Sequence, residues 1–174
     1  MRKIFYLPDV LQTTDYDCGV ECAQTIMAYY GEDYTEYELE KILKVSREYG
    51  TSINELVRFF KSLDLQVWAG EMDQDKLKKL IDKRFPVILL IQAWSTIDHD
   101  YKNEEEWGHY VVACGYDDKG FIFEDPAMFG KGHLTYEELN DRWHGEDEIL
   151  RRNFGIVVWG KEPYDYKNTL YPIG

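Results

Sequence analysis

The chain has 174 residues, a length typical of one domain with a substantial hydrophobic core rather than of two. Its hydrophobic content of 44% is that of a folded protein, and 33 acidic against 20 basic side chains give a net charge of −13. Such a surface repels phosphate backbones and anionic lipids, which excludes nucleic acid and membrane surfaces as expected partners, whereas a peptide or protein substrate is compatible with it.

The cysteines and the N-terminus indicate the compartment. Three cysteines, an odd number, do not make the framework of a disulfide-rich secreted protein. The basic residues Arg2 and Lys3 are followed by only four apolar residues before Pro8, which is too short for a secretory signal. The longest apolar run, 87–91, is too short to cross a bilayer. The sequence therefore predicts a soluble cytoplasmic protein without a membrane segment.

The first half of the chain carries helical patterns. Apolar residues recur at helical spacing over 17–30, with Asp17 as an N-cap that would place Cys18 in the first turn. Two further helices are expected after Thr35 and Ser52, because each is followed three residues later by a glutamate, as in a capping box.

The second half is richer in strands. The expected elements are a short strand at 65–69, a helix near 73–82, a strand at 86–91 buried on both faces, strands at 109–114 and 121–124, a helix from Thr135 and a strand at 154–159. Gly120 is expected to take a positive φ in the turn 117–120. Helices first and an antiparallel sheet second predict an α+β fold in a single domain, 1–174. Its helical part spans about 17–64, its sheet part about 65–160, and a C-terminal tail 161–174.

Cys18 is the central chemical observation. A cysteine in the first turn of a helix meets backbone N–H groups and the positive end of the helix dipole, and both favour a thiolate. Gly19 would leave space for an acyl substrate beside the sulfur. A free cysteine is more often a buried structural residue, so Cys18 needs suitable partners to be interpreted as a nucleophile.

Two such partners can be named. Gln12 lies six residues upstream, across a turn-like segment that could bring its amide back to Cys18 as an oxyanion donor beside the Cys18 N–H. His109 precedes an apolar strand and is the best candidate base of the four histidines. The other three are expected to be exposed or locally hydrogen-bonded, namely His99, His133 and His144.

Asp125 is the expected partner of His109. It ends the strand after the turn and precedes Pro126, which stops the ladder. If Gly120 forms a bulged turn, Asp117 pairs with Phe121, and odd positions then face odd ones. His109 and Asp125 would lie on the same face, two pairs apart. Asp117 is the other candidate for the residue that orients His109. Its alternative role is to stabilise the turn.

These residues resemble a known family in their order and context. The matching blocks are Gln12 before Asp17-Cys18-Gly19, Tyr29-Tyr30-Gly31, Gly50-Thr51-Ser52, Pro86-Val87-Ile88, Gly108-His109-Tyr110-Val111-Val112, Gly115-Tyr116-Asp117 and Asp125-Pro126-Ala127. Together, from about 7 to 143, they resemble the bacteriocin-processing endopeptidases, family 39 of the cysteine peptidases, which cleave after a double-glycine leader. Glu21 and Cys22 stand where small residues are usual, and an acidic loop at 98–106 precedes His109.

The resemblance implies a papain-like fold with Cys18 as nucleophile, His109 as base, Asp125 as orienter and Gln12 in the oxyanion hole. It implies peptide-bond hydrolysis without a cofactor or a metal. Family members are commonly the N-terminal part of ABC exporters. This chain carries no membrane or nucleotide-binding segment, so we expect a stand-alone peptidase.

Three other functions stay open. The same triad serves transamidation, deamidation and isopeptide cleavage, which sequence does not separate from hydrolysis. A non-catalytic peptide-binding domain would usually lack the Cys or His that are present here. A metal site built from Cys18, Cys22 and histidines lacks a second ligand pair at a recognisable spacing.

Overall fold

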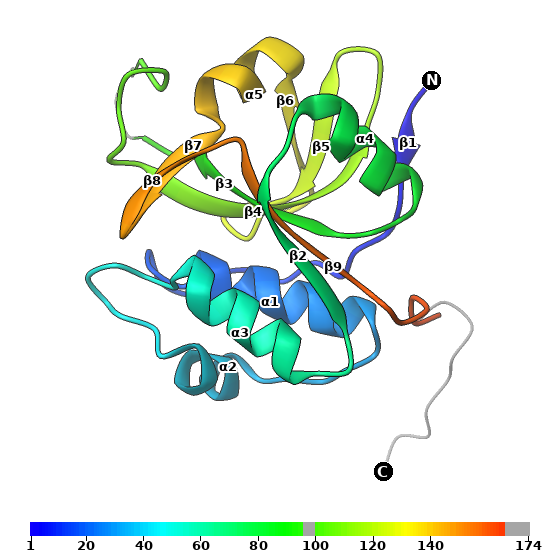
Figure 1. The fold of residues 1–174 in the computed structure, drawn as a ribbon, viewed down its shortest axis with the longest axis vertical. Helices are drawn as coiled ribbons and strands as arrows, with labels where there is room; N and C mark the ends of the chain where they lie inside the picture. The colour runs from blue at the N-terminus through cyan, green and yellow to red at the C-terminus, as the bar shows by residue number, and fades with distance from the viewer. Residues whose placement is uncertain (96–99, 166–174) are drawn as a thin grey trace.

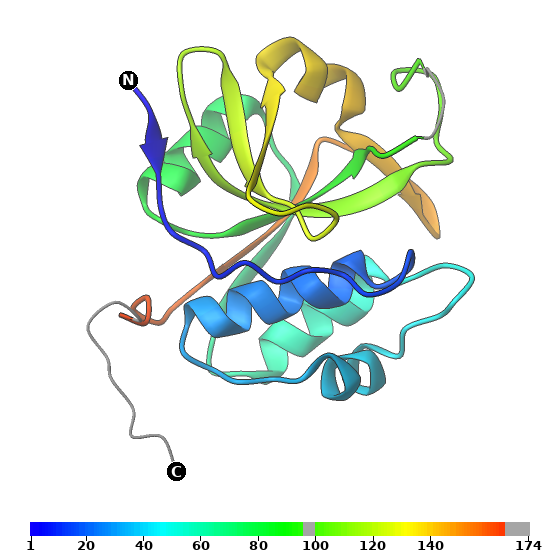
Figure 2. The same ribbon diagram turned by 180° about the vertical axis from the view of Figure 1, so that it is seen from behind.

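The computed structural model describes residues 1–95 and 100–165. A helical layer packs against a larger layer that contains the sheet and two more helices (Figure 1). The view from behind shows the N-terminal segment running from the sheet along α1 before the chain turns into that helix (Figure 2). Among the described residues, no helix combines the length and apolarity needed to span a bilayer. The expected acidic loop 98–106 and tail 161–174 lie partly outside the described residues.

The helices of the first half lie where local signals predicted them. They are α1 (Cys18–Tyr29), α2 (Glu36–Leu43) and α3 (Ile53–Ser62). Thr35 and Glu38 form a full capping box. Ser52 caps α3 by accepting from the Glu55 N–H, but the Glu55 carboxylate does not return to the cap. That carboxylate instead binds the cations of neighbouring side chains, Lys44 and Arg58.

The strands form an antiparallel sheet, which together with the helices confirms the predicted α+β class. The strands are β1 (Lys3–Ile4), β2 (Gln66–Glu71), β3 (Val87–Gln92), β4 (Gly108–Tyr116), β5 (Gly120–Glu124), β6 (Lys131–Thr135), β7 (His144–Asp147), β8 (Ile149–Arg152) and β9 (Phe154–Trp159). Within the described chain, the main sheet has the order β2-β9-β3-β4-β5-β6, with β1 also beside β4. A separate hairpin joins β7 to β8.

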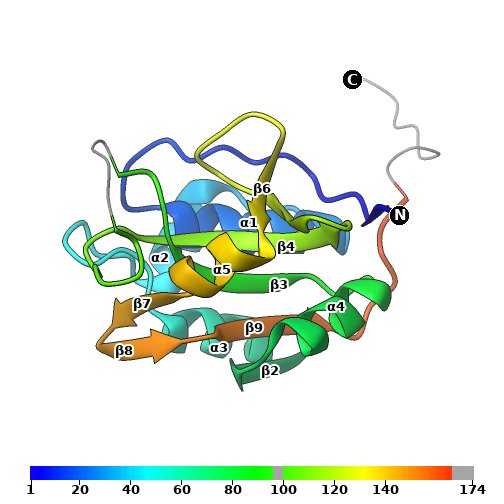
Figure 3. The ribbon, with the colours of Figure 1, turned by 90° about the horizontal axis from the view of Figure 1, so that it is seen from above.

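Helices cover both faces of this sheet. The helices α1 and α3 lie against one face, and α4 (Gln74–Asp82) and α5 (Tyr136–Arg142) lie against the other (Figure 3). Every residue of β3 is buried between its neighbours β9 and β4. The missing polar alternation in β3 is therefore explained by burial on both faces, as predicted.

A β-bulge sets the register between β4 and β5. Near the turn Tyr116 pairs with Phe121, but the register shifts between Ala113 and Gly115, so that Val112 pairs with Glu124. The carbonyl of the extra residue, Cys114, is hydrogen-bonded, because the Phe5 N–H donates to it at 3.0 Å.

Two expectations for this region are wrong. Asp117 does not pair with Phe121, and the bulge lies in β4 rather than in the turn. Gly120 does not have a positive φ. Gly120 is required because an added Cβ would lie 1.9 Å from the Leu134 carbonyl oxygen of β6. Four strands were not predicted: β1, β6, β7 and β8.

We expect Gly120→Ala to lower the free energy of unfolding by about 1–3 kcal/mol, because the new methyl group forces β5 and β6 apart. Urea unfolding followed by circular dichroism measures this loss. Gly108→Ala is the matched control, since its Cβ would meet only the Leu90 side chain at 3.7 Å. Equal unfolding midpoints for the two variants would contradict the close approach of β6.

Candidate active site

Cys18 is the first residue of α1 and is partly exposed. Asp17 occupies the N-cap position as predicted, but its side chain does not cap the helix. Its Oδ2 instead accepts from the backbone N–H groups of Thr13 at 3.2 Å and Thr14 at 3.0 Å. The carboxylate therefore fixes the turn that leads into Cys18 rather than the helix itself.

Gly19 is packed closely against neighbouring elements. A Cβ at this position would lie 2.7 Å from Cβ of Thr51 and 3.2 Å from the ring of Tyr110. The missing side chain allows α1 to approach Thr51 and β4 closely, and the expected space for a substrate beside the sulfur stays a prediction. This close packing brings Cys18 towards the start of β4.

His109 and Asp125 form a buried hydrogen-bonded pair. Nε2 of His109 donates to Oδ1 of Asp125 at 2.7 Å, and both residues are 6% exposed. The thiol of Cys18 lies near enough to the His109 side chain to help raise its pKa. Because Nε2 faces Asp125, Nδ1 is the nitrogen available to Cys18. The structure thus brings together three of the four residues that the sequence singled out.

The electrostatics of the pair favour charge on both members. Burial alone would lower the pKa of His109, but hydrogen bonds to Asp125 and Cys18 outweigh it and raise that pKa to about 9. Burial would likewise raise the pKa of Asp125, but the donors around its carboxylate hold that pKa below its usual range. Both shifts favour an imidazolium beside a carboxylate.

Trp94 is a site residue that sequence reasoning missed. Its indole Nε1 donates to Oδ2 of Asp125 at 3.1 Å, while the Ala127 N–H donates to Oδ1 at 2.9 Å. Trp94 follows β3 with a φ of +61°, a conformation that L-residues seldom adopt. The sequence showed a tryptophan two residues after a buried strand, but no neighbouring residue indicated its contact with Asp125.

Gln12 lies next to the Asp125 loop. Its backbone N–H donates to the Pro126 carbonyl at 2.9 Å. Its side-chain Oε1 is buried and has no hydrogen-bond partner within the described residues. The structure therefore places residue 12 beside the site, while the expected approach of its amide to Cys18 stays a prediction.

The rival residues have other roles. Asp117 closes the β4–β5 turn by accepting from the N–H groups of Lys119 and Gly120. His133 is exposed, and its Nε2 lies 3.6 Å from Oδ1 of Asp117. His144 is buried and hydrogen-bonds to the Tyr101 and Asp141 carbonyls. His99 lies outside the described residues.

The other two cysteines are buried structural thiols. Cys22 is 1% exposed and Cys114 is 0% exposed. Burial raises the pKa of both, that of Cys114 to about 12. Among the described residues, the group of side chains close enough together to share a metal ion consists of three carboxylates at α1 and α2. It includes neither cysteine.

A groove of about 990 Å³ runs past Cys18. Its lining includes Gly108 and Tyr110 of β4, the neighbours of His109. Its charged lining residues are predominantly acidic: Asp15, Glu48, Glu55, Glu105, Glu106, Glu146, Asp147 and Glu148, against Lys44 and Arg47. An extended chain bound there would reach the thiol in a strongly negative field.

Comparison with solved structures shows the same fold. A C39-like peptidase from Bacillus anthracis superposes with a TM-score of 0.71 at 15% identity, over 93% of this chain and 99% of that one. A double glycine motif protease from an AMS/PCAT transporter, solved in complex with its leader peptide, gives a TM-score of 0.66 at 19% identity, over 90% and 94% of the two chains. The papain-like fold expected from the sequence is thereby confirmed.

Sequence comparison gives the family. The lactococcin-G-processing and transport ATP-binding protein LagD of Lactococcus lactis subsp. lactis is 27% identical over 170 residues, which is 98% of this chain and 20% of that protein. The chain thus spans about a fifth of the length of this relative. The profile of the Peptidase C39 family matches residues 7–151, which include Cys18, His109 and Asp125. The chain therefore belongs to the Peptidase C39 family.

Proposed function

We propose that this chain is a cysteine peptidase that hydrolyses peptide bonds with Cys18 as nucleophile. The observation that carries the proposal is the position of His109, which hydrogen-bonds to Asp125 through Nε2 and whose pKa is raised by both Asp125 and the nearby thiol at the start of α1. Nucleophile, base and orienting carboxylate in this order are the constellation of thiol acyl transfer.

In the first half of the reaction, the Cys18 thiolate attacks the carbonyl carbon of the scissile bond and a C–S bond forms. The carbonyl oxygen becomes an oxyanion, which the Cys18 N–H and the Gln12 amide stabilise. The His109 imidazolium then gives its proton to the leaving nitrogen. The C–N bond breaks, the amine departs, and an acyl-enzyme is left on Cys18.

In the second half, neutral His109 takes a proton from water as the oxygen attacks the acyl carbon. The C–S bond breaks, the carboxylic acid product leaves, and Cys18 and His109 return to the ion pair. Asp125 keeps the imidazole oriented through Nε2 and stabilises its charged form. Trp94 and the Ala127 N–H hold the carboxylate in place for that task.

The proposed substrates are peptides, and the relatives indicate a first substrate to test. One related structure is described as a double glycine motif protease bound to a leader peptide, and the sequence relative as a lactococcin-processing protein. Two synthetic peptide libraries, one with a fixed central Gly-Gly and one without it, therefore test cleavage and its specificity together.

Cys18→Ala should abolish cleavage of these libraries, while Cys22→Ala and Cys114→Ala should keep it. In the folded wild-type protein, limiting iodoacetamide near neutral pH should modify Cys18 selectively, because the other two thiols are buried and have raised pKa values. Peptide mapping by mass spectrometry reads both cleavage and labelling.

Two results would reject the proposal. Cleavage that survives in Cys18→Ala would remove the nucleophile, and equal labelling of the three thiols in the folded state would remove its special environment. Selective labelling without cleavage of either library would favour a non-catalytic peptide-binding domain. Products that carry an added amine in place of hydrolysed ends would favour transamidation.

Gln12→Ala should lower kcat by roughly 10²–10³, the usual loss for one oxyanion donor, with little change in the fold. The backbone hydrogen bond from residue 12 to Pro126 survives this substitution, so circular dichroism should match the wild type. Steady-state kinetics on the best library peptide give the answer. An unchanged kcat would exclude Gln12 from the reaction.

The acidic groove should favour basic substrates. A cleaved peptide with lysines near the scissile bond should have a kcat/KM higher than its glutamate counterpart by on the order of tenfold at low salt, with the difference shrinking as salt screens the field. The double variant Glu105→Gln, Glu106→Gln should reduce the preference, because both residues line the groove. Glu137→Gln, at an exposed position of α5 outside the groove, is the control. A preference that is unaltered in the double variant would contradict the assignment.

A further inference from the structure

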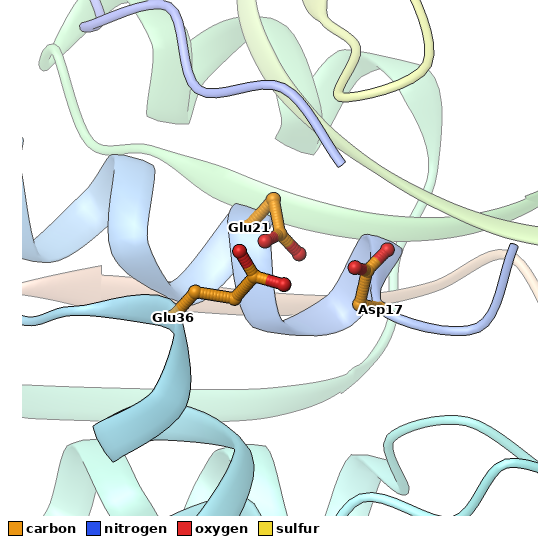
Figure 4. Close-up of side chains that lie close together, drawn as sticks. All are labelled: Asp17, Glu21 and Glu36. Atoms are coloured by element: carbon orange, nitrogen blue, oxygen red, sulfur yellow. The ribbon is translucent and has the colours of Figure 1, made fainter. Parts of the chain in front are cut away.

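Three carboxylates converge beside the start of α1. Asp17 directly precedes α1, Glu21 lies in the first turn of α1, and Glu36 comes from the start of α2. One oxygen from each lies within 4.8 Å of the others. Figure 4 shows the three side chains gathered in the space between the two helices.

Glu21 is a buried carboxylate without a hydrogen-bond partner among the described residues. Its side chain is 1% exposed, and neither carboxylate oxygen has a hydrogen-bond partner within the described residues. Asp17 is 0% exposed, and its Oδ1 likewise has no partner there. Glu36 is half-buried and accepts from the Thr13 hydroxyl through Oε1 at 2.7 Å. No lysine or arginine among the described residues forms an ion pair with any of the three.

This arrangement is unfavourable without a counter-charge, because buried charges are normally paired or coordinate a metal. Burial first, and then the neighbouring Asp17 and Glu36, raises the pKa of Glu21 to about 9. A proton on Glu21 would relieve one charge and leave the other two carboxylates facing each other. The α1 N-terminus contributes only about half a positive charge.

We propose that Asp17, Glu21 and Glu36 bind a divalent cation, specifically Ca²⁺. A donor set made only of carboxylate oxygens suits hard cations. Calcium takes oxygen ligands at about 2.3–2.6 Å in flexible geometry, so oxygens across the ion lie about 4.6–5.2 Å apart. The observed spacing of up to 4.8 Å fits this range. Magnesium dehydrates reluctantly and demands a strict octahedron, to which three carboxylates from two different helical segments adapt less readily.

The bound ion would join parts of the chain that the active site needs in place. Asp17 fixes the turn 13–17 through Thr13 and Thr14, and Thr13 also donates to Glu36. An ion between the three carboxylates therefore connects α2 to the turn between Gln12 and Cys18. The binding site itself does not depend on the proposed peptidase activity.

The test is isothermal titration calorimetry of the full chain, freed of metal with EGTA and dialysed into about 150 mM NaCl to suppress loose binding to an acidic surface. We expect one Ca²⁺ per chain, with Kd in the range of about 10⁻⁵–10⁻³ M, and a Tm that rises with CaCl₂ as mass action requires. Mg²⁺ should bind more weakly.

Glu21→Gln keeps the size of the side chain and removes its charge, so it should weaken Ca²⁺ binding at least tenfold. Glu36→Gln, on a half-buried position with less risk to folding, should do the same. Glu137→Gln, an equal charge change on α5, should bind Ca²⁺ like the wild type. Near-UV circular dichroism confirms that each variant is folded.

No heat and no change in Tm at millimolar CaCl₂ would overturn the proposal. So would Ca²⁺ binding that persists unchanged in both Glu21→Gln and Glu36→Gln, because the ion would then sit elsewhere. Tighter binding of Mg²⁺ than of Ca²⁺ would overturn the assignment of the ion. None of these results depends on whether the chain cleaves peptides.

Discussion

The register of β4 against β5 is the constraint on which the candidate active site depends. Side chains alternate across a sheet, so a shift of one residue moves a side chain to the opposite face. Continued without interruption from the Tyr116–Phe121 pair, the register would set Asp125 opposite Val112, on the face away from His109. The bulge at Cys114 shifts the pairing by one, and Asp125 falls opposite Val111, on the same face as His109. The β1 segment supports this bulge, since the Phe5 N–H satisfies the Cys114 carbonyl.

Asp125 and Glu21, two of the buried carboxylates near Cys18, differ in their hydrogen-bond partners. Asp125 receives donors from His109, Trp94 and the Ala127 N–H, which stabilise its ionised form and lower its pKa. Glu21 receives none among the described residues, and burial raises its pKa to about 9. The environment of Asp125 thus stabilises a carboxylate that binds an imidazolium, whereas the environment of Glu21 favours binding of a proton or a cation. This difference separates the proposed catalytic function of one from the proposed metal-binding function of the other.

Local signals predicted the helices and five of the strands, whereas contacts between distant segments determined features that the sequence did not show. Thr35 with Glu38 and Thr135 with Glu138 act within one helical turn, so their capping boxes were visible in the sequence. His109 and Asp125 were placed on one face by a bulge expected at Gly120, whereas the actual bulge at Cys114 depends on β1, over a hundred residues earlier in the chain. Trp94 was missed because its contact with Asp125 requires a left-handed φ that no neighbouring residue indicates.

The most direct test of the central claim, an ion pair between Cys18 and His109, is the rate of Cys18 alkylation by iodoacetamide as a function of pH. The raised pKa of His109 means that the imidazolium persists up to about pH 9 and is lost above it. We therefore expect wild-type Cys18 to be alkylated faster than Cys18 of His109→Ala at every pH below about 9, because the imidazolium favours the thiolate, and we expect the difference to shrink above that pH. A wild-type profile that coincides with that of His109→Ala would contradict the ion pair.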